Sequence, residues 1–156
     1  MRIQAADSPS DIIAVRQLFE EYWQSFGFTP CFQGFADEVA ALPGKYSPPR
    51  GRLALAINND GGDNLAGCAA LRPVDATRAE AKRLYVRPEF RGRGVGAALL
   101  EYLIDEARAA GYLEMVGDTM PVMTDALALY KRRGFELTGP YSPDPTPGAV
   151  YIRLVL

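Results

Sequence analysis

The sequence predicts a mixed α/β fold, in which a mostly antiparallel sheet of about seven strands is flanked by about four helices. Three observations lead to this class: the length of 156 residues, apolar residues at helical spacing in some segments, and short apolar runs between turn formers in others. A chain of this length buries about 68–70% of its unfolded surface, so its core needs neither disulfide nor metal. We expect residues 1–156 to form a single domain.

The predicted helices are residues 9–24, about 34–42, 96–110, and a segment from Thr119 or Pro121 to about 132. The first has the clearest start, because Ser8 is placed as its N-cap, Pro9 at the first helical position and Asp11 three residues after the cap. The third follows a glycine-rich run and ends at Gly111.

The predicted strands are residues 2–6, 53–57, 65–71, 80–86, 112–117, 135–138 and 149–155. Turn formers in residues 58–64 make the second and third of these an antiparallel hairpin. The stretch from Phe26 to Arg52 contains one short helix and several aromatic residues, Phe28, Phe32 and Phe35 among them. Long connections of this kind are usually functional or poorly ordered.

Composition excludes several classes of function. Seventeen basic and 19 acidic residues give a net charge of −2, so no overall basic field indicates a nucleic-acid or membrane partner. The absence of histidine removes Ser-His and Cys-His nucleophile pairs and the common zinc sites, and no metal is expected. Cys31 and Cys68 form no CxxC pair, and Cys68 is predicted to be a small core residue. With no long apolar run, we expect a cytoplasmic protein.

A glycine loop precedes the third helix. Gly92, Gly94 and Gly96 allow a sharp turn that leaves amide groups open, and the helix N-terminus adds unpaired donors, so a phosphate or pyrophosphate is the natural ligand. Arg87, Arg91 and Arg93 add cations around the loop. A solvent-exposed turn without a ligand is the alternative.

Two other phosphate-binding loops compete with this interpretation. A P-loop is excluded, because Val95-Gly96-Ala97 stands where Gly-Lys-Ser/Thr is required. A dinucleotide-binding loop fits Gly92-x-Gly94-x-x-Ala97, with Asp118 as its acidic residue. However, residues 87–91 separate that loop from its strand, and the remaining chain is too short for a long βαβ series.

Two runs resemble motifs of the GNAT superfamily of N-acetyltransferases. Residues 84–96 resemble its acetyl-CoA-binding motif, with Arg91, Gly94 and Gly96 at the defining positions, and residues 126–136 are similar to its Ala-x-x-Leu-Tyr-x-x-x-Gly-Phe run. The order of elements matches the family across nearly the whole chain. The resemblance implies a GNAT-like fold and transfer of acetyl from acetyl-CoA to an amine. No covalent acyl-enzyme is expected, because no Cys or Ser can be activated without histidine and neither cysteine lies in the motif region.

The resemblance also implies the residues that bind acetyl-CoA. Amides of residues 92–97 would take the pyrophosphate, and the main chain near residues 84–86 would pair with the pantetheine arm. Met123 stands where many relatives carry an asparagine that reaches the pantetheine, and Thr124 is the candidate replacement. The candidate cofactor-binding residues are Leu84, Tyr85, Val86, Arg91, Gly92, Arg93, Gly94, Val95, Gly96, Ala97 and Thr124.

Tyr130 and Glu80 are the candidate catalytic residues. Tyr130 stands where many relatives keep a tyrosine that assists the leaving thiolate, and its ordinary pKa of about 10 favours a hydrogen bond over full proton donation. A buried helix aromatic is the alternative. Glu80 is the candidate general base, with a plain ion pair to Lys82 or Arg83, or a water chain in its place, as alternatives. Strand alternation predicts that Glu80, Lys82, Leu84 and Val86 share one face.

The acceptor is expected to be a small-molecule amine or an amino acid. Lys82 on the cleft face could hold a substrate carboxylate, and Tyr46, Arg50 and Tyr141 are further candidates, although Arg50 could equally be a surface charge. A protein or peptide amine, and a non-catalytic acyl-CoA sensor, remain alternatives. A homodimer is also an alternative, because the hairpin and the final strands could pair between two subunits.

Overall fold

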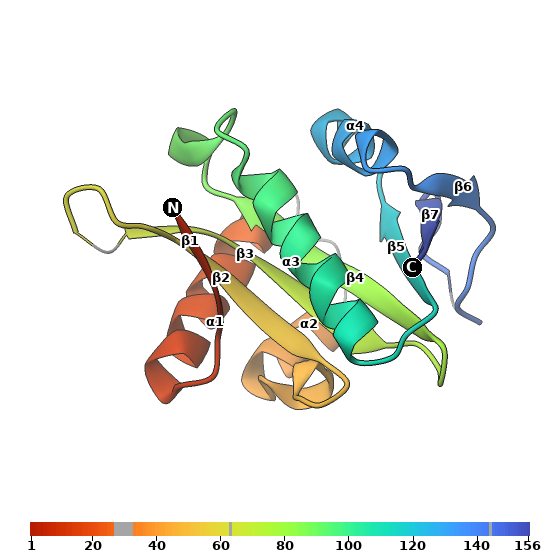
Figure 1. The fold of residues 1–156 in the computed structure, drawn as a ribbon, viewed down its shortest axis with the longest axis horizontal. Helices are drawn as coiled ribbons and strands as arrows, with labels where there is room; N and C mark the ends of the chain where they lie inside the picture. Colours follow the sequence, from red (N-terminus) through yellow and green to blue (C-terminus); the bar gives the residue numbers. More distant parts are fainter. Residues whose placement is uncertain (27–32, 63, 144) are drawn as a thin grey trace.

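The structure is a computed structural model and describes residues 1–26, 33–62, 64–143 and 145–156. Within these residues one sheet has the strand order β1-β2-β3-β4-β5-β7-β6 (Figure 1). The strands are β1 (Arg2–Ala5), β2 (Arg52–Asn58), β3 (Asn64–Pro73), β4 (Arg78–Val86), β5 (Glu114–Thr119), β6 (Glu136–Thr138) and β7 (Val150–Val155). Neighbours are antiparallel except for β4 and β5, so the predicted mixed, mostly antiparallel sheet is confirmed.

The helices are α1 (Pro9–Gln24), α2 (Gln33–Ala40), α3 (Val95–Ala109) and α4 (Thr124–Arg132), with short 3₁₀ turns at Gly44–Tyr46 and Pro88–Phe90. Ser8 and Asp11 form the predicted capping box at the start of α1. The fourth helix begins later than predicted, because β5 extends to Thr119 and the chain then turns, with the amide of Met123 donating to the carbonyl of Met120. Within the described residues, no helix has the length and apolarity that crossing a membrane requires.

Figure 1 shows α3 over one face of the sheet and α1 and α2 over the other, and each face carries its own apolar cluster. On one face, α3 buries Leu99, Leu103 and Ile104, and α4 joins this cluster. On the other face, α1 and α2 pack against residues that include Cys68, which is buried as predicted for a small core residue. Three residues of the predicted connection, Cys31, Phe28 and Phe32, lie outside the described residues.

A bulge interrupts β4. Lys82 pairs with Ala70 and Tyr85 pairs with Cys68, so β4 uses one residue more than β3 over the same distance. Arg83 lies within this irregularity and has a φ of 57°. Such an insertion reverses the side-chain alternation beyond it.

The reversal corrects one prediction. Before the bulge, Glu80 and Lys82 face the side of α1 and α2, and after it Leu84 and Val86 pack into the α3 cluster. The four side chains therefore do not share a face. The bulge has no signature in the sequence, since neither glycine nor proline marks it.

The sheet also opens between its two parallel strands. Pairing of β4 with β5 covers Arg78–Glu80 against Glu114–Val116 and ends there. β5 continues along β7 to Thr119, and β4 continues along β3 to Val86. The two strands therefore separate after Glu80, and the candidate site lies in this opening.

Candidate functional site

A pocket occupies the opening between β4 and β5. Its lining residues are Tyr22, Ala81, Lys82, Arg83, Leu84, Asp118, Thr119, Met123, Ala126 and Tyr130. Tyr22 belongs to α1 on one face of the sheet, whereas Tyr130 belongs to α4 and packs with the cluster on the other face. The pocket therefore joins the two faces, which gives two reactants separate sides from which to approach.

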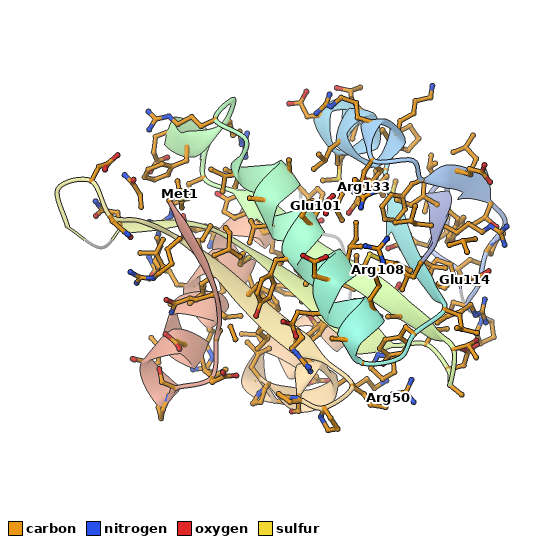
Figure 2. All side chains as sticks on the ribbon, viewed as in Figure 1. Met1, Arg50, Glu101, Arg108, Glu114 and Arg133 are labelled. Atoms are coloured by element: carbon orange, nitrogen blue, oxygen red, sulfur yellow. The ribbon has the colours of Figure 1, made fainter. Side chains whose placement is uncertain are left out.

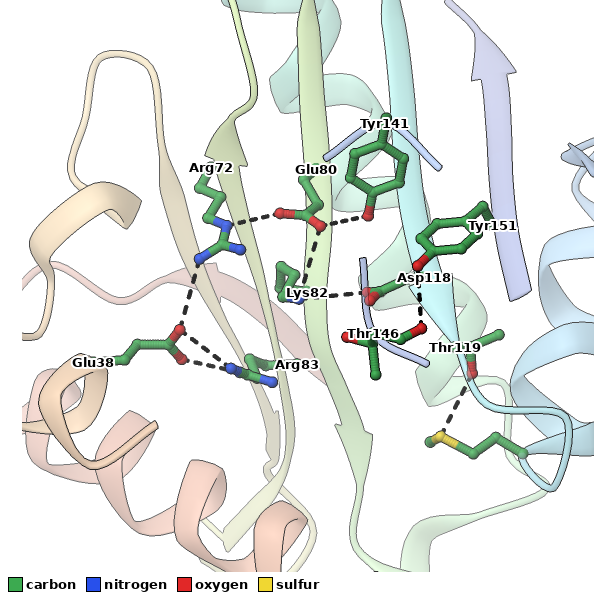
Figure 3. A network of polar contacts seen from close by, with 11 residues as sticks. Glu38, Arg72, Glu80, Lys82, Arg83, Asp118, Thr119, Tyr141, Thr146 and Tyr151 are labelled. Atoms are coloured by element: carbon green, nitrogen blue, oxygen red, sulfur yellow. Dashed lines mark hydrogen bonds and ion pairs between the residues drawn. The ribbon is translucent and has the colours of Figure 1, made fainter. Parts of the chain in front are cut away.

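A network of ionic groups covers the α1 and α2 side of this opening (Figure 3). Arg72 donates from Nε to Glu80 Oε1 at 2.7 Å, and the Tyr141 hydroxyl donates to Glu80 Oε2. Lys82 Nζ lies 3.7 Å from Glu80 Oε2 and 3.4 Å from Asp118 Oδ1.

Glu38 of α2 extends the network. It accepts from Arg83 Nε at 2.9 Å and from Arg83 Nη2 at 3.2 Å, and it lies 3.8 Å from Arg72. The cluster thus balances three carboxylates, Glu38, Glu80 and Asp118, against three cations, Arg72, Lys82 and Arg83. An ionic cluster in a partly buried place is stable when each charge has a partner.

Glu80 is held in the ionised form. Only 5% of its surface is exposed, and this burial acts to raise its pKa. The charges of Lys82 and Arg72 and the hydrogen bonds from Tyr141 and Arg72 outweigh burial, so the pKa of Glu80 lies below its ordinary value. The ion pair with Lys82 that the sequence offered as an alternative is present, and Arg83 pairs with Glu38 instead.

Tyr130 reaches the pocket from the α3 side. It is 5% exposed, and its ring meets Phe135 edge to face at 5.2 Å. Burial raises the pKa of the Tyr130 hydroxyl well above its ordinary value, and the nearby Tyr22 and Asp118 add to the effect. The hydroxyl is therefore a neutral donor at physiological pH.

The glycine loop, residues 92–97, forms an open turn at the start of α3, which we call the cradle. Gly92 and Gly94 have φ values of 75° and 79°, and a Cβ on either would meet no atom within 4 Å. Gly94 is the N-cap, and the turn closes with the Ala98 amide donating to the Gly94 carbonyl at 3.0 Å. The amides of residues 95–97 precede this bond, and a helix leaves such amides without an intrahelical partner. This donor set suits a pyrophosphate.

The arginines near the loop have different roles. Arg91 donates from Nε to the Val86 carbonyl at 2.9 Å, and Arg93 stacks on the Phe90 ring with its guanidinium carbon 5.6 Å from the centroid. Arg87 instead forms hydrogen bonds from Nε and Nη2 to Glu21 on α1. Arg91 and Arg93 thus belong to the glycine loop itself and form no ion pair among the described residues, while Arg87 ties the end of β4 to α1.

The structure brings some predicted site residues together and leaves others apart. Lys82, Leu84 and Tyr130 line the pocket, and Glu80 and Tyr141 belong to the network beside it. Thr124 is exposed at the start of α4, and Met123 lines the pocket in its place. The Tyr85 side chain turns to the α1 face and contacts Tyr22, so that the main chain of this residue is what remains for a ligand.

Two predicted acceptor-binding residues are not at the pocket. The Arg50 guanidinium lies over the Tyr112 ring and donates to the Asp75 carbonyl at 2.9 Å, at the end of α3 farthest from the glycine loop (Figure 2). Tyr46 is 2% exposed, packs against Phe19 and does not line the pocket. Both side chains serve packing in the connection before β2.

Sequence reasoning did not assign Asp118 to this site, nor Glu38, Arg72 and Arg83. Asp118 did carry a signal, because it is a charged residue at the end of an apolar strand. The others carried none, since Glu38 meets Arg83 across 45 positions of the chain. Among the described residues, His, Cys, Asp and Glu form no group of three or more that could hold a metal.

The family model described as the Acetyltransferase (GNAT) family matches residues 13–135. The chain is 40% identical over 153 residues to an uncharacterised N-acetyltransferase of Schizosaccharomyces pombe, covering 97% of this chain and 93% of the relative.

Solved structures share the fold. An acetyltransferase from Streptococcus agalactiae superposes with a TM-score of 0.81 at 20% identity, over 99% of this chain and 98% of the other. A GNAT family acetyltransferase from Elizabethkingia anophelis with acetyl-CoA bound superposes with a TM-score of 0.61 at 22% identity, over 99% and 97%. The arrangement of seven strands and four helices is thus that of these enzymes.

Proposed function

Since the chain belongs to the GNAT acetyltransferase family, we propose that it transfers acetyl from acetyl-CoA to the amine of a small molecule or amino acid, by direct attack on the thioester. One observation carries the proposal: Tyr130 of α4 lines a pocket that also contains the ion pair of Lys82 and Asp118, and the open glycine loop starts α3, which packs in the same apolar cluster as Tyr130. This arrangement suits a nucleotide thioester on one face and a polar acceptor on the other.

The residues of the cradle fit the phosphates of acetyl-CoA. The amides of residues 95–97 would donate to the pyrophosphate, and Arg91 and Arg93 would add positive charge. The main chain at residues 84–86 borders the opening beside β5, where the pantetheine arm would lie. When bound, acetyl-CoA supplies the activated acetyl group.

Tyr130 would stabilise the departing thiolate by a hydrogen bond. Tyr130 lines the pocket, and the raised pKa of its hydroxyl makes complete proton transfer to sulfur unfavourable. A donor whose hydrogen bond strengthens as charge develops can lower the barrier by about 2.7–4 kcal/mol.

Glu80 is proposed to relay the proton that the amine loses; because its pKa lies below the ordinary value, it would pass this proton on to solvent and not keep it. An amine with a pKa of about 10.4 is about one part in a thousand neutral at pH 7.4, so a route for this proton is needed. Because Glu80 is buried and accepts from Tyr141, the Tyr141 hydroxyl would receive the proton and pass its own to Glu80. Full activity after Glu80→Gln would leave a water chain as the route.

The first experiment measures thiol release from acetyl-CoA with a panel of amino acids, monoamines and polyamines. Release that depends on an amine supports the proposal. Acetyl-CoA binding without release on any amine would favour a non-catalytic sensor. A thermal-shift screen of acetyl-CoA against NADH separates the dinucleotide alternative, because a ligand at 100 times its Kd stabilises by about 2.7 kcal/mol.

A matched pair of variants tests the cradle. Gly94 and Gly111 lie at opposite ends of α3, both have positive φ, and a Cβ on either would meet no atom within 4 Å. Gly94→Ala and Gly111→Ala should each lose about 1 kcal/mol of stability through backbone strain. Gly94→Ala alone should weaken acetyl-CoA binding, by about 10-fold in calorimetry, if one charge-assisted hydrogen bond is lost. Equal affinity for acetyl-CoA in both variants would show that the glycine loop is not the binding site.

A further inference from the structure

Lys82 and Asp118 are an ion pair inside the pocket. Lys82 comes from β4 and Asp118 from β5, on the two sides of the opening, and both line the pocket together with Tyr130. Their side chains are 14% and 22% exposed, so a ligand in the pocket can reach them. Figure 3 shows the pair on the side of the network nearest β5.

This pair is held more loosely than the arginine pairs. Arg72 and Arg83 each have a contact under 3 Å to a carboxylate, at 2.7 Å and 2.9 Å. Both contacts of Lys82 are longer, at 3.4 Å to Asp118 and 3.7 Å to Glu80. Ordinary hydrogen bonds of this kind measure about 2.7–3.2 Å, so the lysine ammonium has capacity for a closer partner.

Asp118 is placed differently from Glu80. The Glu80 oxygens accept from Arg72 and Tyr141, and Glu80 does not line the pocket. Asp118 lines the pocket, and among the described residues its ion-pair partner is Lys82. Asp118, and not Glu80, is therefore the carboxylate that an acceptor amine would meet when it enters the pocket beside Tyr130.

The charge balance of the network selects the kind of acceptor. Its three carboxylates and three cations already compensate one another. A cationic monoamine that paired with Asp118 would leave Lys82 with Glu80 alone at 3.7 Å. A zwitterion would replace one ion pair by two and leave no partly buried charge without a partner.

We propose that Lys82 and Asp118 recognise the acceptor as a free α-amino acid, Asp118 binding its amino group and Lys82 its carboxylate. This inference rests on the proposed function and names the substrate class. The adjacent charges of the pair match the adjacent ammonium and carboxylate groups of such a ligand. The amino group would then lie on the Asp118 side of the pocket, in reach of the face that carries Tyr130.

The decisive test compares each of the twenty α-amino acids with its primary amide in the wild-type protein. The amide keeps the amine and the side chain but lacks the negative charge. Its amine is also less basic, so reactivity alone favours the amide. We expect kcat/KM for the best amino acid to exceed that for its amide by about 10- to 100-fold, the value of one charge-assisted hydrogen bond.

Variants assign the preference to the pair. In Lys82→Met the ratio of acid to amide should fall to near one, and in Lys82→Arg it should persist. In Asp118→Asn the KM for acid and amide should both rise by about 10-fold or more, while calorimetric affinity for acetyl-CoA stays unchanged. Lys131→Met and Asp105→Asn, at exposed positions of α4 and α3, are the matched controls and should retain the wild-type ratio.

The outcomes distinguish a failure of amino-acid recognition from a failure of the proposed acetyltransferase function. Thiol release on amines with a wild-type ratio near one, or with monoamines preferred, would overturn amino-acid recognition and leave the acetyltransferase proposal standing. An unchanged ratio in a folded Lys82→Met protein would overturn the role of Lys82. Thiol release on no acid, amide or monoamine would overturn the proposed function itself. The wild-type comparison needs no variant, so it decides even if Lys82→Met fails to fold.

Discussion

Tyr130 lies where several effects act on one hydroxyl. Its ring is fixed against Phe135, its surface is almost fully covered, and the neighbouring Asp118 carries negative charge. Burial first, and then this charge, disfavour a phenolate, so the hydroxyl stays protonated through the pH range in which amines become nucleophilic. That is the property a hydrogen-bond donor to a leaving thiolate needs.

Tyr130→Phe should lower kcat by about 100-fold, the lower end of what a positioned proton donor or hydrogen-bond donor contributes. The KM for acetyl-CoA should change little, because the interaction forms with the leaving group. Thiol-release kinetics measure both. Tyr112→Phe is the control: it also removes a buried hydroxyl, which bonds to Arg50 at the other end of α3, and it should cost stability and leave kcat unaltered. Equal kcat values in wild type and Tyr130→Phe would make Tyr130 a packing residue.

Motif spacing placed a residue at the pocket where the motif fixes the backbone. Tyr130 lines the pocket because it lies on the helix that the second motif places, and Lys82 lines it although the bulge overturns the face that strand alternation gave it. Arg50 and Tyr46 belong to the connection before β2, where no periodicity says which way a side chain turns. The sequence therefore offered both residues as acceptor ligands by their chemical type, but it did not predict that their side chains lie away from the pocket.

The β4 bulge gives the sheet its functional shape. Arg83 has a positive φ, a conformation that costs a residue with a side chain about 1–3 kcal/mol. Its guanidinium is fixed in return by two bonds to Glu38 and lies 5.2 Å from the Phe35 ring centroid. The contact with α2 thus helps to hold the strand in the form that turns Leu84 and Val86 away from the network.

Glu38→Gln should destabilise the protein by about 2–3 kcal/mol, because Arg83 is largely buried and would lose its counter-charge. Urea unfolding measures the change. Glu101→Gln breaks a more exposed pair with Arg133 between α3 and α4 (Figure 2), and it should cost less than about 1 kcal/mol. Equal losses in the two variants would contradict the role given to Glu38.

The start of α1 was predictable and the faces of β4 were not, for a physical reason. The capping box at Ser8 is a local device whose residues lie within one turn, so the sequence contains all of it. The bulge at Arg83 is stabilised by Glu38, 45 positions away, so no window of the sequence contains its cause. Strand alternation is reliable only between such interruptions.

The molecule as a whole separates two chemical environments by a sheet and joins them at one opening. Both faces carry an apolar cluster, but the glycine loop lies on the α3 side, while the balanced ionic network lies on the α1 and α2 side. Order along the chain predicted the sheet and its helices, but not that the partners of this network would meet, since they come from α2, β3, β4, β5 and the loop after β6. The network couples the site to global stability, because it ties these segments together.

This coupling predicts a pH dependence of folding. The pKa of Glu80 in the native protein lies below its ordinary value of about 4.3 in the unfolded chain. Above the ordinary value the carboxylate is ionised in both states and contributes fully to stability; as pH falls through the lower native value, that contribution disappears. The free energy of unfolding of the wild type, minus that of Glu80→Gln, should therefore shrink as pH drops below about 4.

Urea unfolding of both proteins between pH 7 and 3 measures this difference. Asp75→Asn provides a comparison outside the site: hydrogen bonds from Arg78 and Thr77 lower the pKa of Asp75 to about 2, so its contribution should persist to more acid pH than is needed to protonate an ordinary aspartate. A difference between wild type and Glu80→Gln that stays constant down to pH 3 would mean that Glu80 is not held as the carboxylate centre of the network. The cations around the pocket would then lack the negative charge that balances them, and the proposed recognition of a zwitterionic acceptor depends on that balance.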